Sequence, residues 1–401
     1  MKVLQINAVY KNGGSTGRIA YDLKNVSEKD GIEAYVAFGF EYEKTSDLNT
    51  YKIESIPELK FSILQTRLFG MHGFYNISST KRLISWISEI KPDLIHLHNL
   101  HCHYMNIDLL FRYIKANNIP VVWTLHDCWA FTGWCAHFDY VGCEKWKTHC
   151  HSCELKHSYP FTWFFDNSEE LYDKKKNVFC GVDNLTIVTP SNWLASKVKD
   201  SFLKDYSTVV INNGIDLNVF KPLKTDFRNK YKLNGKKIVL AIANGFSKNK
   251  GIDFILKLPD VLPNDHVVVI VGADPSLCKE FNGIVINRTN NVQELASIYS
   301  AADVFINPTL EDTFPTTNLE ALACGTPVIT YRAGGSPESI IAGTGIVIDK
   351  GNEEEFVDAI IGLNKTEKIS TACRQHAERC FDKIDRYYDY IELYKSVLTH
   401  G

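Results

Sequence analysis

Two carboxylates, Asp312 and Glu320, stand eight residues apart in a segment that leads into an apolar run. Eight residues are about two turns of a helix, so both side chains can lie on one face. Residues 316–319 would then begin the helix, where peptide N–H groups can bind phosphate. Because carboxylates accept hydrogen bonds from sugar hydroxyls, the segment can hold a nucleotide-sugar. An acidic loop before a buried helix fits the same pattern.

Glycines follow the first strand-like run of the chain. Gly13 and Gly14 stand where a helix is expected to begin. Glycine lets the backbone come close to a ligand, and the start of a helix favours anions. A glycine turn without any ligand fits the pattern equally well.

Histidines stand at the ends of two predicted strands. His126 and Asp127 follow one of them, in a position where active-site loops occur in α/β proteins. His96 and His98 alternate on another strand and therefore share a face. We expect His96 to be a core histidine satisfied by backbone groups, and His98 to lie near the strand end, close to a ligand cleft.

Four cysteines form a cluster that is suited to a metal ion: Cys135, Cys143, Cys150 and Cys153. Cys150-His-Ser-Cys153 has the C-x2-C spacing of zinc knuckles, and four thiolates suit tetrahedral zinc. The first two cysteines do not form a second knuckle, so reduced thiols and disulfides remain alternatives. Neighbouring histidines are alternative ligands: His137, His149 and His151.

Composition places these residues in an ordinary globular protein. A chain of 401 residues, 45% of them hydrophobic, is long enough for two domains. The net charge of −3 gives no indication of nucleic-acid binding. The first residues form a strand pattern that is too short for a signal peptide, and no apolar run is long enough to span a bilayer. We therefore expect a soluble cytosolic protein, in which eleven cysteines indicate thiols or metal binding.

Apolar β-rich runs alternate with helical stretches along the chain. The predicted strands are Val3–Ile6, Ala34–Phe38, Leu94–Leu97, Val121–Leu125, Leu185–Thr189, Ile238–Ala243, Val267–Val271, Val304–Ile306 and Val328–Thr330. This alternation is typical of parallel sheets with helices on both faces, and the two sets predict two doubly wound domains with a ligand cleft at the strand ends. The turn-rich residues 212–216 mark the boundary, and residues 377–399 are predicted to be helical.

Apolar and basic residues mix in Leu59–Tyr75, and Trp163, Phe164 and Phe165 add aromatic side chains further on. Such a segment can lie on an anionic membrane surface. A helix packed on its own domain is the alternative.

The segment from Asp312 to Glu320 resembles the E-x7-E signature of the retaining glycosyltransferases of family four. The resemblance runs through nearly the whole chain in the family's order, from Gly13-Gly14 to Gly334-Gly335-Ser-Pro-Glu338. One departure is that Asp312 stands where the family usually has Glu. The resemblance implies an α/β fold of the GT-B type, with two Rossmann-like domains facing across a cleft and a terminal helix that crosses back to the first domain.

The resemblance also implies a domain plan. Residues 1–210 would form an acceptor-side domain with a cysteine-rich insertion at 128–157. Residues 211–380 would bind the nucleotide-sugar, and residues 381–401 would pack back on the first domain.

The family's functional positions fall on defined residues of this chain. The catalytic set implied is His126, Asp127, Lys250, Asp312 and Glu320. The set implied to bind the nucleotide-sugar is Gly13, Gly14, Lys248, Arg288, Thr316, Thr317, Asn318 and Glu338. A second departure is that the family's arginine before the Lys-Gly pair has no clear equivalent, and Lys248 is the nearest cation. A lysine-rich surface turn is the alternative for this loop.

The implied function is transfer of a hexose-type sugar, with retention, from a UDP- or GDP-linked donor. No D-x-D pair occurs, so Lys250 and helix amides would neutralise the leaving diphosphate without a metal, and zinc would be structural only. The implied acceptor is a lipid-linked oligosaccharide of bacterial capsule, exopolysaccharide or O-antigen synthesis, with no nucleic acid. The enzyme would lie in the cytoplasm, on the inner face of the membrane if it associates peripherally. A non-catalytic sugar-binding scaffold and a nucleotide-sugar epimerase are the rival hypotheses.

Overall fold

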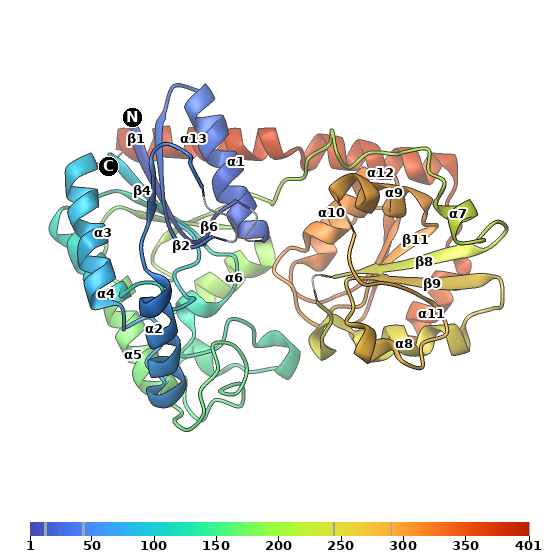
Figure 1. Cartoon of the computed structure of the whole chain (residues 1–401), viewed down its shortest axis with the longest axis horizontal. Coiled ribbons are helices and arrows are strands. Elements are labelled where there is room, and N and C mark those ends of the chain that lie inside the picture. The colour runs from blue at the N-terminus through green and yellow to red at the C-terminus, as the bar shows by residue number, and fades with distance from the viewer. Residues whose placement is uncertain (12–13, 42–44, 244, 290, 401) are drawn as a thin grey trace. The chain divides into compact units, whose positions relative to one another are not determined.

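The computed structural model of the chain describes residues 1–11, 14–41, 45–243, 245–289 and 291–400. The chain forms two compact units (Figure 1). Unit 1 comprises Met1–Ile211 together with Tyr387–Gly401, and unit 2 comprises Asn212–Arg386. In the part of the chain that the structure describes, no helix is long and apolar enough to cross a membrane.

Among the described residues, unit 1 contains a seven-stranded sheet in the order β3-β2-β1-β4-β5-β6-β7, and its neighbouring strands are parallel. The strands are β1 (Lys2–Val9), β2 (Glu33–Phe40), β3 (Thr50–Lys52), β4 (Leu94–Leu97), β5 (Val121–Thr124), β6 (Leu185–Thr189) and β7 (Ser207–Val210). The helices are α1 (Ser15–Lys29), α2 (Ile56–Phe69), α3 (Ile77–Ile90), α4 (Ile107–Ala116), α5 (Ser168–Phe179), α6 (Asn192–Asp200) and, from Tyr387 onward, α13 (Lys383–His400).

Side chains alternate between the two faces of this sheet, so each face has its own core. Leu4 and Ile6 of β1 pack with residues of α3, α4, α5 and α6. Val3 of β1 packs on the other face with residues of α1 and with Tyr390 and Tyr394 of α13. The last helix therefore belongs to the hydrophobic core of unit 1.

Unit 2 repeats this architecture. Its described residues form a six-stranded sheet in the order β10-β9-β8-β11-β12-β13, again with parallel neighbours. The strands are β8 (Lys237–Ile242), β9 (His266–Val271), β10 (Ile284–Ile286), β11 (Val304–Asn307), β12 (Val328–Tyr331) and β13 (Gly345–Ile348). The helices are α7 (Phe227–Lys230), α8 (Ile252–Val261), α9 (Val292–Ala301), α10 (Thr316–Ala323), α11 (Glu353–Gly362) and α12 (Glu367–Cys380).

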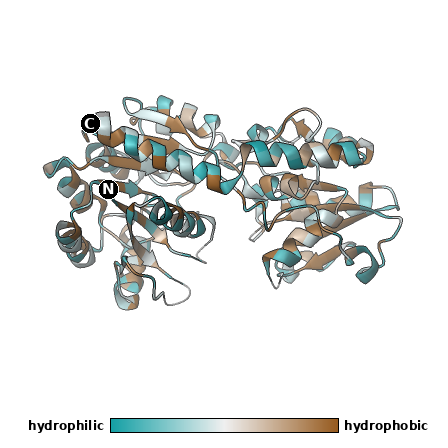
Figure 2. Ribbon diagram, turned by 90° about the horizontal axis from the view of Figure 1, so that it is seen from above, coloured by the Kyte–Doolittle hydropathy of each residue, from teal (hydrophilic) through white to brown (hydrophobic). Residues whose placement is uncertain are grey.

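Helices cover both faces of the second sheet as well. Residues of α9, α10 and α12 pack on one face and residues of α8 and α11 on the other. Figure 2 shows that helices of both units carry hydrophilic and hydrophobic residues along their length, as expected for helices with one side on a sheet. The α/β fold expected from the sequence, with two doubly wound sheets, is confirmed.

Each sheet reverses its strand order at one point. In unit 1 the reversal lies between β1 and β4, and in unit 2 it lies between β8 and β11. Connections leave such a point to opposite faces of the sheet, and ligands bind in the crevice that results at the carboxyl ends of the strands. A ligand site is therefore expected in the loops that follow these four strands.

The helical prediction for residues 377–399 is confirmed apart from one break, because α12 ends at Cys380 and α13 begins at Lys383. The chain between them is held by unit 2. The Phe381 carbonyl accepts a hydrogen bond from the Ile215 N–H at 2.7 Å, and Ile215 forms a parallel bridge with Asp382. A residue in this bridge cannot continue the helical hydrogen-bond pattern.

Candidate functional site

The switch point of unit 2 brings two predicted site residues together. Lys250 ends a short 3-10 helix, Lys248–Lys250, in the loop after β8, and Asp312 lies in the loop after β11. Lys250 Nζ lies 2.6 Å from Asp312 Oδ2, and both side chains are partly exposed. An ammonium group beside a carboxylate at this position can bind an anion and a hydroxyl of one ligand.

The backbone around Asp312 is held by close packing. The Asp312 carbonyl accepts a hydrogen bond from the Gly335 N–H at 2.9 Å, and Asp312 Oδ1 accepts one from the Phe314 N–H at 3.2 Å. Gly334 has φ +58°, and a Cβ added there would stand 1.9 Å from the Asp312 carbonyl oxygen. Only glycine fits at position 334, so this residue sets the place of the Asp312 loop.

Helix α10 starts at Thr316, behind a Pro315 cap that offers no side-chain hydrogen bond. Asn318 is fully buried, and its side chain is occupied: Oδ1 accepts from Asn307 Nδ2, and Nδ2 donates to Ser336 Oγ and Ser339 Oγ. Its peptide N–H donates to the Pro315 carbonyl. The expectation that Asn318 binds a ligand therefore has no support in its geometry, and Thr316 and Thr317 carry the N–H groups expected to point at an anion.

Glu320 lies one turn further along α10 and does not join the Lys250–Asp312 pair. Its Oε2 accepts a hydrogen bond at 2.8 Å from the hydroxyl of Tyr299. Burial raises the pKa of Glu320 to about 7, and the Tyr299 hydrogen bond offsets only part of that rise. The side chain therefore exchanges its proton near neutral pH.

The other predicted residues of unit 2 lie in loops at the surface. Lys248 and Arg288 are exposed, the first in the 3-10 helix after β8 and the second after β10. Glu338 is partly exposed in a 3-10 helix, Ser336–Ser339. These side chains form none of the contacts that join Lys250 to Asp312 or Glu320 to Tyr299.

The glycine loop of unit 1 follows β1. Gly14 has φ +88° and precedes α1, and its carbonyl accepts the hydrogen bond from the Arg18 N–H that starts the helix. A Cβ at Gly14 would have no neighbour within 4 Å. The glycine is thus required by the backbone angle rather than by packing. Gly13 lies outside the described residues.

His126 stands in a chain of hydrogen bonds with His98 and Gln5. His98 Nδ1 lies 3.1 Å from His126 Nε2, and His98 Nε2 lies 3.1 Å from Gln5 Oε1. Gln5 must direct its NH2 group at the Ala20 carbonyl, 3.2 Å away, because that oxygen can only accept. The Gln5 oxygen therefore accepts from His98 Nε2–H.

The protonation states of both imidazoles follow from this chain. Burial lowers the pKa of His98 well below its usual value and that of His126 to about 4, so both rings are neutral at pH 7. His98 carries its proton on Nε2, so its Nδ1 accepts from His126 Nε2–H. His126 Nδ1 then carries no proton and can only accept a hydrogen bond.

His96 is buried as expected, but the predicted backbone partners are wrong. Its Nδ1 lies 2.6 Å from the hydroxyl of Tyr394, and its Nε2 lies 2.8 Å from Thr124 Oγ1. Tyr394 belongs to α13, about 300 residues away in sequence, so no local pattern could have indicated this partner. The pair instead ties the last helix to the first sheet.

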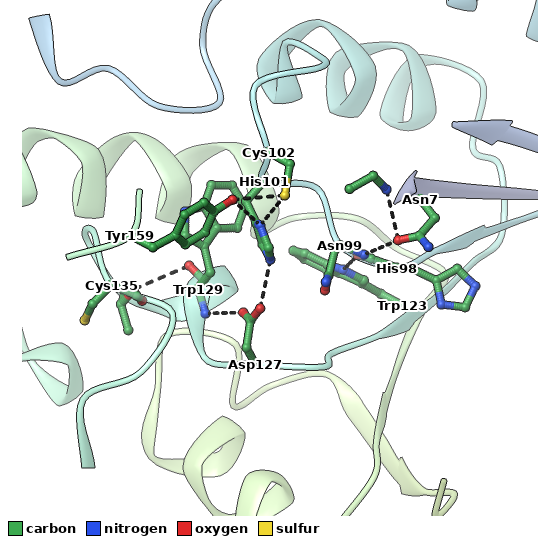
Figure 3. Close-up of polar contacts among 12 residues, drawn as sticks. Asn7, His98, Asn99, His101, Cys102, Trp123, Asp127, Trp129, Cys135 and Tyr159 are labelled. Carbon is green, nitrogen blue, oxygen red and sulfur yellow. Dashed lines mark hydrogen bonds and ion pairs between the residues drawn. The ribbon is translucent and has the colours of Figure 1, made fainter. Parts of the chain in front are cut away.

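Asp127 is paired with a histidine that the sequence analysis missed (Figure 3). His101 Nε2 lies 2.8 Å from Asp127 Oδ2, and the Trp129 N–H donates to Asp127 Oδ1 at 2.9 Å. Burial alone would raise the pKa of Asp127, but the His101 imidazole outweighs it and holds the pKa at about 2. His101 and His103 continue the run of histidines after β4, and that run is the sequence feature from which His101 could have been identified.

The zinc site predicted from Cys135, Cys143, Cys150 and Cys153 is not supported. Among the described residues, no group of three or more His, Cys, Asp or Glu is placed to hold a metal ion. Cys135 and Cys153 share a hydrogen bond, which together with burial raises the pKa of Cys135. Burial raises the pKa of Cys150 to about 11, and its sulfur accepts from the Gly133 N–H.

Aromatic packing organises the cysteine-rich loop instead. The rings of Phe138 and Trp146 stack at 4.8 Å, and Phe131 lies 5.3 Å from Trp146. All three side chains are buried. Burial of large aromatic side chains stabilises the loop.

The fold places the chain in the GT-B class of two successive doubly wound domains. It belongs to glycosyltransferase family 4. The profile of Glycosyltransferase Family 4 matches residues 16–219, and that of Glycosyl transferases group 1 matches residues 236–365. The chain is therefore a glycosyltransferase, of a family whose members in general retain the sugar's configuration and act without a metal.

One relative is similar along most of its length. The chain is 26% identical over 383 residues, covering 92% of this chain and 91% of the relative, to WcaC of Escherichia coli K12, which is provisionally named a colanic acid biosynthesis glycosyl transferase. Two solved structures share the fold. Sucrose-phosphate synthase of Thermosynechococcus elongatus has a TM-score of 0.74 at 16% identity, with both chains covered fully. HepE of Anabaena, in complex with UDP and glucose, has a TM-score of 0.67 at 17% identity over 99% of this chain and 100% of that chain.

Proposed function

We propose that the chain transfers a hexose from a UDP-sugar to a lipid-linked oligosaccharide during assembly of a bacterial surface polysaccharide. The relationship to WcaC, which is named for colanic acid biosynthesis, supports the pathway class. The HepE structure with UDP and glucose supports uridine diphosphate as the nucleotide. The structural observation that supports a binding site for the sugar donor is the Lys250–Asp312 pair at the switch point of unit 2.

Lys250 and α10 would hold the leaving diphosphate. Lys250 supplies a positive charge, and the N–H groups of Thr316 and Thr317 supply the positive end of the helix dipole. Asp312 would then accept hydrogen bonds from the hexose hydroxyls, and Glu320 from the ribose. Charge already in place stabilises the diphosphate as the bond from C1 to oxygen breaks.

The remaining steps need no protein nucleophile. As the C1–O bond breaks, the sugar becomes oxocarbenium-like, and the acceptor hydroxyl attacks from the face that the diphosphate leaves. The acceptor proton passes to the leaving phosphate oxygen, so configuration is retained. In unit 1, the unprotonated Nδ1 of His126 is suited to accept a hydrogen bond from a sugar hydroxyl.

Helix α2 supports a lipid-bearing acceptor, because its apolar side chains face outward. Phe61, Leu64 and Phe69 are 61%, 43% and 55% exposed, whereas Ser62 and Thr66 of the same helix are buried. An exposed apolar helix face with basic neighbours is suited to the surface of an anionic membrane.

The aromatic segment 163–165 extends this apolar surface. Trp163 donates its peptide N–H to the Arg67 carbonyl near the end of α2, and the Arg67 guanidinium lies 5.8 Å from the Trp163 ring. Trp163, Phe164 and Phe165 are all exposed. Changing Phe61, Leu64 and Phe69 to Ser should therefore abolish sedimentation with phosphatidylglycerol vesicles, while Val261→Ser, an exposed apolar control in α8, should not. Equal binding by both variants would refute the membrane role.

Calorimetric titration with UDP, GDP and their hexose conjugates tests the donor site. We expect micromolar binding of the uridine series by the wild type. Lys250→Ala should weaken it about tenfold to a hundredfold, because a hydrogen bond to a charged group contributes about 1.5–3 kcal/mol. The control is Lys257→Ala, a lysine of α8 that is 64% exposed and pairs with Glu353.

Two outcomes would contradict the proposal. Binding that Lys250→Ala leaves unchanged would remove Lys250 from the donor site. Donor binding without any hydrolysis of the UDP-sugar, with or without acceptor lipid, would favour the sugar-binding scaffold.

A further inference from the structure

His101 is the centre of a second cluster in unit 1, whose members come from three loops (Figure 3). Its Nδ1 lies 3.1 Å from Cys102 Sγ and 2.7 Å from the hydroxyl of Tyr159. The Tyr159 hydroxyl lies 3.0 Å from Cys102 Sγ. On the other side of the ring, Nε2 lies 2.8 Å from Asp127 Oδ2. A thiol, an imidazole and a carboxylate thus follow one another within hydrogen-bond distance, which is the arrangement that activates a nucleophile.

The hydrogen bonds assign the protons of this cluster. Asp127 also accepts from the Trp129 N–H, so it is the ionised acceptor of His101 Nε2–H. A buried carboxylate needs a positive partner, and the imidazolium form of His101 provides it. That form has Nδ1–H directed at Cys102 and Tyr159, so the sulfur is left as a thiolate that accepts from Nδ1–H and from the Tyr159 hydroxyl.

The protonation equilibria agree with this assignment. Burial alone would raise the pKa of Cys102, but the His101 imidazole outweighs it and lowers the pKa below the usual thiol value. Burial would lower the pKa of His101, but Cys102 and Asp127 together raise it to about 10. The Tyr159 hydrogen bond also lowers the pKa of Cys102, whereas the charge of Asp127 raises it, and Cys102 in turn raises the pKa of Glu54 and Tyr104. Burial raises the pKa of Glu54 to about 8, so it is mostly neutral at pH 7.

The exposure of the residue also bears on its reactivity. Cys102 is partly exposed and sits at φ +81° in the loop after β4. Cys153 is also partly exposed and has a pKa lowered by a hydrogen bond with Cys135, whereas the following three thiols differ from Cys102 in exposure or in the direction of the pKa shift. Cys324 and Cys373 are buried, and burial raises the pKa of both to about 12. Cys278 is partly exposed, but burial raises its pKa as well.

We propose that Cys102 is a reactive thiolate and a site of covalent modification by peroxides and soft electrophiles, activated by His101 and Tyr159 and oriented through Asp127. With a peroxide, the thiolate attacks one oxygen, an S–O bond forms and the O–O bond breaks. The sulfur is oxidised by two electrons to a sulfenic acid, and the departing hydroxide takes the Nδ1 proton of His101 to form water. Asp127 then faces a neutral imidazole instead of a cation. Modification of Cys102 therefore changes the charge next to Asp127, the residue that follows His126 in the chain.

Iodoacetamide alkylation, followed peptide by peptide by mass spectrometry from pH 5 to 10, tests the site. The thiolate displaces iodide and forms an S–C bond, so the rate reports the thiolate fraction. The Cys278 peptide in the same digest is the control. At pH 6.5 we expect Cys102 to react at least about tenfold faster than Cys278, with a midpoint below the usual thiol pKa of about 8.5.

Two variants separate activation from simple exposure. Tyr159→Phe keeps the ring but removes the donor to sulfur, and His101→Gln removes the cation. Each should raise the midpoint of Cys102 and slow its alkylation at pH 6.5 severalfold, with Cys278 unchanged. The proposal is overturned if Cys102 in the wild type reacts no faster than Cys278, or if its midpoint stays the same in Tyr159→Phe. Neither outcome depends on the identity of the sugar donor.

Discussion

Glu320 provides a prediction whose size follows from the structure. Its pKa is raised from 4.5 to about 7, with burial as the main cause, so about nine-tenths of these groups are protonated at pH 6. A ribose hydroxyl that donates to the carboxylate requires the ionised form. Removing the proton at pH 6 costs about 1.4 kcal/mol, which is tenfold in affinity. Nucleotide binding should therefore be about tenfold weaker at pH 6 than at pH 8.

The comparison with Glu320→Gln isolates this effect. Glutamine resembles the protonated acid and does not titrate, and the phosphate of UDP titrates identically with both proteins. The ratio of the wild-type to the variant Kd, measured by calorimetry at pH 6, 7 and 8, should fall about tenfold as the pH rises. A ratio that stays constant across this range would show that Glu320 does not bind the ribose as a carboxylate, and the assignment would be refuted.

Two further predictions concern Gly334, which packs against the Asp312 loop of unit 2, and Lys175, which is buried in unit 1. Gly334→Ala should displace the Asp312 carbonyl and weaken UDP-sugar binding at least about tenfold, whereas Gly343→Ala, which also has positive φ but no neighbour within 4 Å, should not; equal effects in calorimetry would disprove the steric argument. Lys175 is buried and donates to the Trp129 and Thr132 carbonyls, and burial lowers its pKa from 10.5 to about 7. The folded state therefore binds fewer protons than the unfolded state between these values, and stability rises with pH there. The free energy of unfolding of wild type minus Lys175→Met should rise by about 1 kcal/mol per pH unit from pH 7 to 9. Tryptophan fluorescence in urea measures it, since all 7 tryptophans lie in unit 1; a flat difference would show that Lys175 stays charged.

The interior strands of both sheets were predictable, and most edge strands were not. The nine predicted runs correspond to β1, β2, β4, β5, β6, β8, β9, β11 and β12. The strands β3, β7, β10 and β13 lie at sheet edges and are not among these nine runs. An interior strand of a parallel sheet is buried on both faces and reads as an apolar run. Edge strands are partly exposed and lack that signal.

The candidate site divides along a similar line. Lys250 and Asp312 were singled out from sequence, but their ion pair depends on β8 and β11 being neighbours, which strand order in the sheet decides. Asn318 was expected to bind the ligand because it lies in the first turn of a helix. Its side-chain amide is instead hydrogen-bonded to three side chains from other elements. His101 was missed because its importance comes from Asp127, which lies 26 residues further along.

By itself, the sequence determined which residues have the chemistry for sugar transfer, the alternation of strands and helices, and membership of glycosyltransferase family 4. These follow from residue type and short-range spacing, which the chain carries without folding. The tertiary structure decided which of those groups face one another and which protons they hold. Pairing of Lys250 with Asp312, the neutral rings of His98 and His126, and the activated thiol of Cys102 all require parts of the chain far apart in sequence to meet. Burial and partner charges set protonation there, and neither can be read from local sequence.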